Sequence, residues 1–143
     1  CFYHYMGIFA KQDRGAVINV SSLTAISSSP YNAQYGAGKS YIKKLTEAVA
    51  AECESTNVDV EVITLGTTIT PSLLSNLPGG PAGEAVMKAA MTPEACVEEA
   101  FDNLGKSLSV IAGDHNKANV HNWQANKTDD EYIRYMGSFY SNN

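Results

Sequence analysis

The chain has 143 residues, of which 44% are hydrophobic, and its formal net charge is −5. This length and composition predict one domain with enough apolar material for a packed core. The negative charge and the lack of a Lys/Arg cluster argue against a nucleic-acid partner, because phosphate binding depends on such clusters. No run approaches the roughly 20 apolar residues of a membrane span, so we expect no membrane partner.

The first elements lead to a serine at the end of a strand. Residues 1–12 are predicted to form a helix, because bulky apolar side chains recur there at helical spacing. Residues 15–20 begin with a glycine and continue as a mainly apolar run with several β-branched residues, which predicts a buried parallel strand ending next to Ser21 and Ser22. Ligand sites of α/β sheets lie at the carboxyl ends of the strands, so Ser22 is a candidate site residue.

A long helix is predicted from about Asn32 to Glu54, after a loop at 27–30, and it carries Tyr35 and Lys39 near its start. Positions i and i+4 share one face of a helix, so the Lys39 ammonium can lie close enough to the Tyr35 phenol to stabilise the phenolate. This pairing would make Tyr35 usable as a general acid or base near neutral pH.

The second half of the chain predicts shorter elements. Val58–Leu65 is a second strand, and the loop Gly66–Pro71 follows at the same sheet edge. Beyond the loop we expect a short apolar turn, a Pro/Gly break over 78–83, a short helix over 85–90, a helix capped by Thr92 and running to about Leu104, a third strand over 108–112, and one or two helices in the polar tail from His115.

Three sequence motifs occur in a fixed order from about Gly15 to Pro71. They are NVSS at 19–22, YxxxK at 35–39 and LGTTIT at 65–70. In this order and spacing the chain resembles the short-chain dehydrogenase/reductase family, although Leu65 stands where the family usually has proline. The resemblance implies an α/β fold: the C-terminal half of a doubly wound parallel-sheet (Rossmann-type) fold, truncated at its N-terminus.

The resemblance also implies roles for the motif residues. Ser22 would polarise the carbonyl of a small alcohol or carbonyl substrate, Tyr35 would exchange the proton, and Lys39 would hold the nicotinamide ribose while stabilising the Tyr35 phenolate. The cofactor would be NAD or NADP, and residues Tyr35, Lys39, Gly66, Thr68 and Thr70 would bind its nicotinamide end. No metal is expected, because the three histidines lack zinc-site spacing.

The same resemblance implies how the domain is organised and that the chain forms a homo-oligomer. Residues 1–143 would be a single partial domain, with a substrate lid at about 71–91 and a helical tail at about 115–143. In the family, the helix over 32–54 and the helix before the NVSS strand form a dimer interface, so we expect a homodimer or higher homo-oligomer.

The dinucleotide-binding half of the family would precede Cys1, and no glycine-rich phosphate turn occurs in this sequence. We therefore expect the isolated chain to bind cofactor weakly or not at all. The alternative to an oxidoreductase is a truncated, non-catalytic fragment or dimerisation module that cannot bind cofactor.

A second, remote alternative is a nucleotide-binding phosphate loop, because residues 33–40 fit [AG]xxxxGK[ST]. Such a loop joins a strand directly to a helix, whereas the strand here ends a dozen residues earlier. The cysteines, Cys1, Cys53 and Cys96, are odd in number and widely spaced, which favours reduced thiols and a cytoplasmic location.

Overall fold

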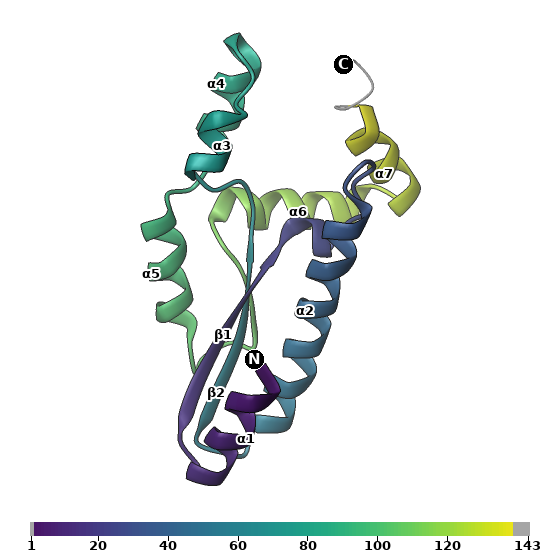
Figure 1. The fold of residues 1–143 in the computed structure, drawn as a ribbon. Coiled ribbons are helices and arrows are strands. Elements are labelled where there is room, and N and C mark those ends of the chain that lie inside the picture. The colour runs from purple at the N-terminus through teal and green to yellow at the C-terminus, as the bar shows by residue number, and fades with distance from the viewer. Residues whose placement is uncertain (1, 139–143) are drawn as a thin grey trace.

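The computed structural model describes residues 2–138, which form a three-stranded parallel sheet flanked by helices (Figure 1). In chain order the elements are α1 (Phe2–Gln12), β1 (Gly15–Ser22), the 3₁₀ helix η1 (Leu23–Ala25), α2 (Ala33–Cys53), β2 (Val58–Leu65), α3 (Pro71–Ser75), α4 (Gly80–Ala89), α5 (Pro93–Asn103), β3 (Ser109–Ile111), α6 (Asp114–Asn126) and α7 (Asp129–Ser138). The predicted α/β class with a parallel sheet is confirmed.

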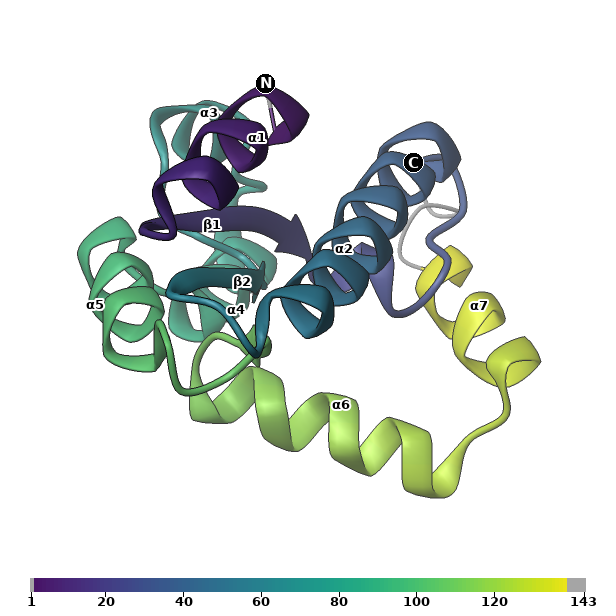
Figure 2. The ribbon, with the colours of Figure 1, turned by 90° about the horizontal axis from the view of Figure 1, so that it is seen from below.

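The strands lie in the order β1-β2-β3. β1 and β2 pair over their full length, from Gly15 opposite Val58 to Ser22 opposite Leu65. β3 pairs with β2 only around Val110, which lies opposite Ile63. Because the strands are parallel, the chain must cross back after each one, and the crossovers carry α2 and α5 onto the two faces of the sheet (Figure 2).

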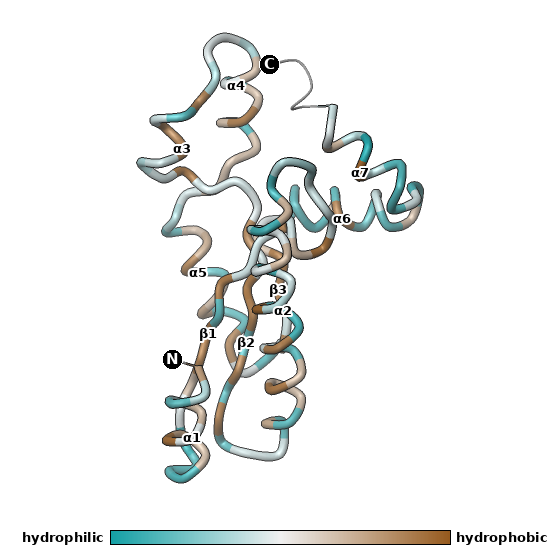
Figure 3. The backbone as a smooth tube through the Cα atoms, turned by 45° about the vertical axis from the view of Figure 1, so that its right-hand side comes forward, coloured by the Kyte–Doolittle hydropathy of each residue, from teal (hydrophilic) through white to brown (hydrophobic). Residues whose placement is uncertain are grey.

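The core consists of two small clusters on opposite faces of β2. On the α2 face, Val58 and Val60 pack with Ala50, and residues of α1 add to this cluster. On the α5 face, Ile63 packs with Ala100. The apolar character of β2 and β3 appears as brown segments in Figure 3. Burial of each large aliphatic side chain contributes about 1.5–3 kcal/mol, so β2 is the most stabilised strand.

The prediction that residues 15–20 form a buried strand is wrong in this structure. β1 is an edge strand: it pairs with β2 alone, and Val20 is 47% exposed. The residues themselves form the expected strand, which continues through Ser22. The difference arises because burial depends on a neighbour on the second edge, which the described residues do not supply.

The segment after β2 also differs from expectation. A break was predicted over 78–83, but α4 begins at Gly80 and includes Pro81 in its first turn. Proline suits this place because its missing N–H is not needed in the first helical turn. The predicted Thr92 cap of the next helix is confirmed, since Thr92 Oγ1 accepts a hydrogen bond from the Ala95 amide at 3.2 Å.

The polar tail forms two helices within the described residues. α6 lies across the carboxyl ends of the strands, while α3 and α4 project beyond the same end of the sheet (Figure 1). α7 follows and packs on the segment after β1, where an added Cβ on Gly137 would lie 3.3 Å from Pro30. The carboxyl edge of the sheet is therefore surrounded by segments from both halves of the chain.

Candidate active site

Ser22 is delivered to the carboxyl edge by β1 and serves as the N-cap of η1. Its Oγ accepts hydrogen bonds from the Thr24 amide at 3.3 Å and from Thr24 Oγ1 at 3.1 Å. A serine hydroxyl has two acceptor positions and one donor, and Thr24 uses the acceptor positions. The Ser22 proton is therefore available for an acceptor such as a carbonyl oxygen.

Tyr35 and Lys39 lie on the same side of α2, one turn apart. Lys39 Nζ is 5.7 Å from the centre of the Tyr35 ring and donates a hydrogen bond to the Val20 carbonyl at 3.0 Å. The ammonium is thus held between the end of β1 and the phenol, in a cation–π arrangement. Tyr35 is 49% exposed, so the phenol is accessible. The approach of the Ser22 hydroxyl to the Tyr35 phenol stays a prediction.

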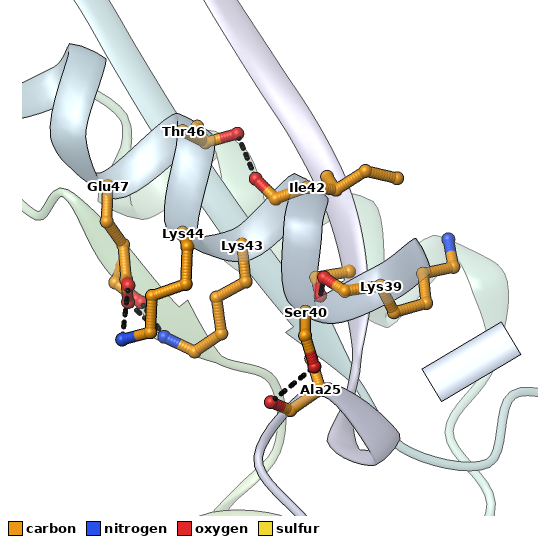
Figure 4. A network of polar contacts seen from close by, with 10 residues as sticks. Ala25, Lys39, Ser40, Ile42, Lys43, Lys44, Thr46 and Glu47 are labelled. Carbon is orange, nitrogen blue, oxygen red and sulfur yellow. Dashed lines mark hydrogen bonds and ion pairs between the residues drawn. The ribbon is translucent and has the colours of Figure 1, made fainter. Parts of the chain in front are cut away.

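Small residues join the end of β1 to α2. The buried Ser21 hydroxyl donates to the Lys39 carbonyl at 2.9 Å. Ser40 Oγ donates to the Ala25 carbonyl at 3.0 Å, a contact that Figure 4 shows. At Gly36 an added Cβ would lie only 3.2 Å from the Thr24 carbonyl oxygen. These contacts fix the segment after Ser22 against the helix turn that carries Tyr35.

Further along α2, polar contacts anchor the helix to the sheet. Asn19 Nδ2 donates to Thr46 Oγ1 at 2.9 Å, and Thr46 donates to the Ile42 carbonyl at 2.7 Å. Lys43 bridges Glu47 of the same helix and Ser109 of β3, and Figure 4 shows the contact with Glu47. This network is remote from Tyr35 and serves to orient the helix.

The loop after β2 is held by contacts with α6 and with the residues before α5. An added Cβ on Gly66 would lie 2.6 Å from Asn116 Oδ1, so a larger residue there would require the Asn116 side chain to move. Thr68 Oγ1 donates to the Gly66 carbonyl at 3.3 Å, and Met91 exchanges backbone hydrogen bonds with this loop. Thr70 caps α3 by accepting from the Leu73 amide at 3.2 Å.

The segment after β1 and the loop after β2 line one cavity of about 280 Å³. Ser22 lies on its wall together with Gly66, and Tyr132 and Met136 of α7 complete the lining. The structure thereby brings together the NVSS and LGTTIT motifs, which are far apart in the sequence. A donor hydroxyl at the wall of such a cavity can bind the oxygen of a small molecule.

Sequence reasoning missed several residues that support the site. Ser21, Gly36 and Ser40 surround the YxxxK motif as small residues, which was a usable signal for a close contact between the helix and a loop. Asn116 and the α7 residues gave no such signal, because their contacts with the loops depend on how the tail folds back.

The phosphate-loop alternative is wrong. Residues 33–40 lie within the α-helix α2, and the preceding strand ends at Ser22. Within 2–138, no group of three His, Cys, Asp or Glu side chains could hold a metal ion. None of the helices in this range is both long and apolar enough to cross a membrane. His4, His115 and His121 are exposed.

The family model for short chain dehydrogenase matches residues 1–77. A protein from Collinsella aerofaciens named 7beta-hydroxysteroid dehydrogenase is 78% identical over 140 residues, which is 98% of this chain and 53% of that protein. A protein of the same name from Mediterraneibacter gnavus is 77% identical over 140 residues, again 98% of this chain and 53% of the relative. The chain spans about half the length of the curated relatives it matches.

Solved structures agree with this likeness. A structure from work on 7beta-hydroxysteroid dehydrogenase stereoselectivity has a TM-score of 0.91 and 77% identity, and the match covers 95% of this chain and 52% of that one. ElxO with NADP bound has a TM-score of 0.63 at 22% identity over 78% of this chain and 49% of the other, which concerns the fold alone. The expected fold class, a part of a Rossmann-type parallel-sheet fold, is confirmed.

Proposed function

Since this chain belongs to the short chain dehydrogenase family, we propose that it carries the acid/base part of a nicotinamide-dependent oxidoreductase that interconverts an alcohol and a carbonyl compound. The placement of Lys39 carries the proposal: its ammonium lies over the Tyr35 ring while bound to the carbonyl of Val20, two residues before Ser22. A cation beside an accessible phenol is the pairing that a proton-exchanging tyrosine requires.

Contacts of Ser22 and Lys39 support the proposed roles. Ser22, whose acceptor positions are used by Thr24, donates its proton to the substrate oxygen. Tyr35 gives a proton to that oxygen during reduction and takes it back during oxidation. Lys39 supplies positive charge beside the Tyr35 ring. The bond to Val20 keeps the ammonium on this side of the helix.

The donor set at the carboxyl edge suits the nicotinamide end of NAD or NADP. The Lys39 ammonium can bind ribose hydroxyls, and Gly66, Thr68 and Thr70 form a loop with backbone and hydroxyl groups that suit a carboxamide. When bound, the cofactor supplies or accepts the hydride at its nicotinamide ring. Membership of the short chain dehydrogenase family supports a nicotinamide dinucleotide.

We further propose a hydroxysteroid as the substrate. The support is the name 7beta-hydroxysteroid dehydrogenase shared by relatives that are 77–78% identical. A steroid is a rigid, largely apolar alcohol, and the cavity beside Ser22 is lined by Leu23, Leu65 and Met136 as well as by polar groups.

A non-catalytic fragment remains the second candidate for the isolated chain. The observation that favours it is the coverage, since the chain spans 53% of its first relatives. In that case these residues would dimerise and would bind cofactor weakly. The exposed Tyr41 on α2, 65% accessible, offers a surface for such a homodimer. A cytoplasmic location also stays a proposal.

The decisive experiment measures turnover and cofactor affinity in a longer enzyme that carries these residues. Tyr35→Phe should abolish turnover and leave cofactor binding nearly unchanged, because only the transferable proton is lost. Lys39→Ala should impair both, because it removes a ribose contact and the charge beside the phenol. Lys44→Ala on the same helix is the matched control and should change neither. Turnover by Tyr35→Phe near the wild-type rate would refute the proposal.

A further inference from the structure

Thr24 is in direct contact with Ser22 and has no role of its own in the chemistry proposed above. Its amide and its Oγ1 donate hydrogen bonds to Ser22 Oγ at 3.3 and 3.1 Å. The first bond is the turn that a serine often forms with the backbone amide two positions further along the chain. The second bond exists only because residue 24 carries a hydroxyl, so the identity of this side chain matters to Ser22.

The two donors restrict where the proton of Ser22 can point. A serine hydroxyl oxygen has two acceptor positions and one O–H. Both acceptor positions receive hydrogen bonds from Thr24, so the O–H takes the remaining position around the oxygen, away from Thr24. Ser22 lies on the wall of the 280 Å³ cavity. A carbonyl oxygen that binds at this wall would therefore meet a hydroxyl whose direction is already set.

The Thr24 hydroxyl also makes Ser22 a stronger hydrogen-bond donor. Hydrogen bonds in a chain polarise one another, so a hydroxyl that accepts a hydrogen bond donates its own proton more strongly. The chain here would run from Thr24 Oγ1 to Ser22 Oγ and from there to the substrate oxygen. Negative charge develops on that oxygen during reduction of a carbonyl, so the chain stabilises the transition state more than the bound substrate.

Other contacts hold the backbone of this segment in place. Ser40 Oγ of α2 donates to the Ala25 carbonyl at 3.0 Å. The Thr24 carbonyl lies so close to α2 that a Cβ added to Gly36, next to Tyr35, would be 3.2 Å from it. Neither contact uses the Thr24 hydroxyl. Removal of this hydroxyl should therefore leave η1 and its packing on the Tyr35 turn intact.

We propose that Thr24 is a positioning residue for the reaction, whose hydroxyl directs the Ser22 hydroxyl toward the substrate oxygen and strengthens it as a donor. Thr24 does not touch the reacting atoms and acts only through Ser22. The inference rests on the proposed function, because it assumes that Ser22 donates its proton to the substrate oxygen.

The first test is a cycle of single and double variants, measured by turnover in a longer enzyme that carries these residues. Thr24→Val keeps the branched shape without the hydroxyl, and should lower kcat about tenfold with KM within about twofold, as for one hydrogen bond lost in the transition state. Thr24→Ser keeps the hydroxyl, and its kcat should stay within about threefold of the wild type. In the Ser22→Ala background, Thr24→Val should lower kcat no further, because the residue through which it acts is absent.

The second test observes the hydrogen bond of Ser22 directly and needs no turnover. A steroid whose only ketone is at position 7 is bound together with the oxidised cofactor, which cannot give it a hydride. A hydrogen bond polarises the carbonyl and lowers its infrared stretching frequency. Thr24→Val should shift this frequency upward, part of the way to the value in Ser22→Ala, whereas Thr24→Ser should leave it unchanged. This measurement decides the matter even where a variant turns over too slowly to be assayed.

Two further variants serve as controls. Thr56→Val removes an exposed threonine hydroxyl at the opposite edge of the sheet, before β2, and should match the wild type in both tests. Thr24→Ala also lacks the hydroxyl and should behave as Thr24→Val does, so the result does not depend on how one variant packs. Circular dichroism should show the same thermal transition for Thr24→Val and the wild type.

Three outcomes would overturn the inference. An unchanged kcat together with an unchanged carbonyl frequency in Thr24→Val would show that the hydroxyl does not act on Ser22. An equal loss of turnover from Thr24→Val with and without Ser22 would show a structural role only. Both results would leave the proposed roles of Ser22 and Tyr35 untouched. By contrast, normal turnover and an unchanged frequency in Ser22→Ala would refute the proposed role of Ser22, and the inference with it.

Discussion

Glu61 allows a test of how a buried carboxyl group affects the stability of this fold. It lies in the middle of β2 and is fully buried, and neither of its carboxylate oxygens has a hydrogen-bond partner. Side chains alternate along a strand, so Glu61 shares its face with Ile63, which packs against Ala100 of α5. A carboxylate in such apolar surroundings is expensive to ionise.

Desolvation raises the pKa of Glu61 from its ordinary value of 4.5 to about 7. The folded state therefore keeps the proton over a range in which the unfolded state loses it. Below pH 4.5 both states are protonated. From pH 4.5 to about 7 the free energy of unfolding falls as pH rises, and above this range the loss is complete. At about 1.36 kcal/mol per pKa unit, the total loss is roughly 3 kcal/mol.

Replacement of Glu61 by glutamine removes this titration with little change in shape. The Glu61→Gln chain should gain roughly 3 kcal/mol relative to the wild type between pH 4.5 and pH 8. Urea unfolding followed by circular dichroism, at several pH values across this range, measures the difference. Glu98→Gln on the exposed side of α5 is the control and should stay within about 0.5 kcal/mol of the wild type. A stability difference between Glu61→Gln and wild type that does not change with pH would refute the reasoning.

Three further predictions concern the loop, the cofactor and the assembly. Gly66→Ala should lower the free energy of unfolding, measured by thermal unfolding, by about 1–3 kcal/mol, because its Cβ would overlap the Asn116 amide. In the double variant, Asn116→Ala should restore part of this loss. Isothermal titration of the 143-residue chain with NAD and with NADP should show weak or no binding up to millimolar concentration, and a micromolar dissociation constant would mean that phosphate-binding elements exist in this chain. Sedimentation should show a homodimer that Tyr41→Lys dissociates, whereas a compact wild-type monomer at micromolar concentration would contradict the proposed α2 interface.

The sequence predicted those elements well whose formation depends on residues close together in the chain. β2 has the bounds expected from its apolar run, and α2 begins and ends within one residue of the prediction. The Thr92 cap followed from residue types at fixed offsets. The proximity of Tyr35 and Lys39 followed from helical geometry and is observed. In each case neighbours within a few positions decide the structure.

The remaining features depend on contacts between distant segments. The exposure of Val20 depends on which strands flank β1, and the burial of Glu61 depends on α5 lying over β2. When a charged residue stands between apolar ones in a strand, the alternation predicts that its side chain faces solvent. Periodicity alone therefore cannot identify a buried glutamate. The contact between Gly66 and Asn116 likewise joins positions 50 apart in the sequence.

The packing of α7 on the segment after Ser22 makes this helix part of the wall of the proposed site. Tyr132 and Met136 share a cavity with Ser22, and Gly137 lies against Pro30. Proteolytic cleavage within Asp129–Ser138 would therefore alter the wall of the Ser22 cavity without touching Ser22, Tyr35 or Lys39. If the proposed function holds, such a cleavage would lower turnover although every proposed acid/base residue is intact.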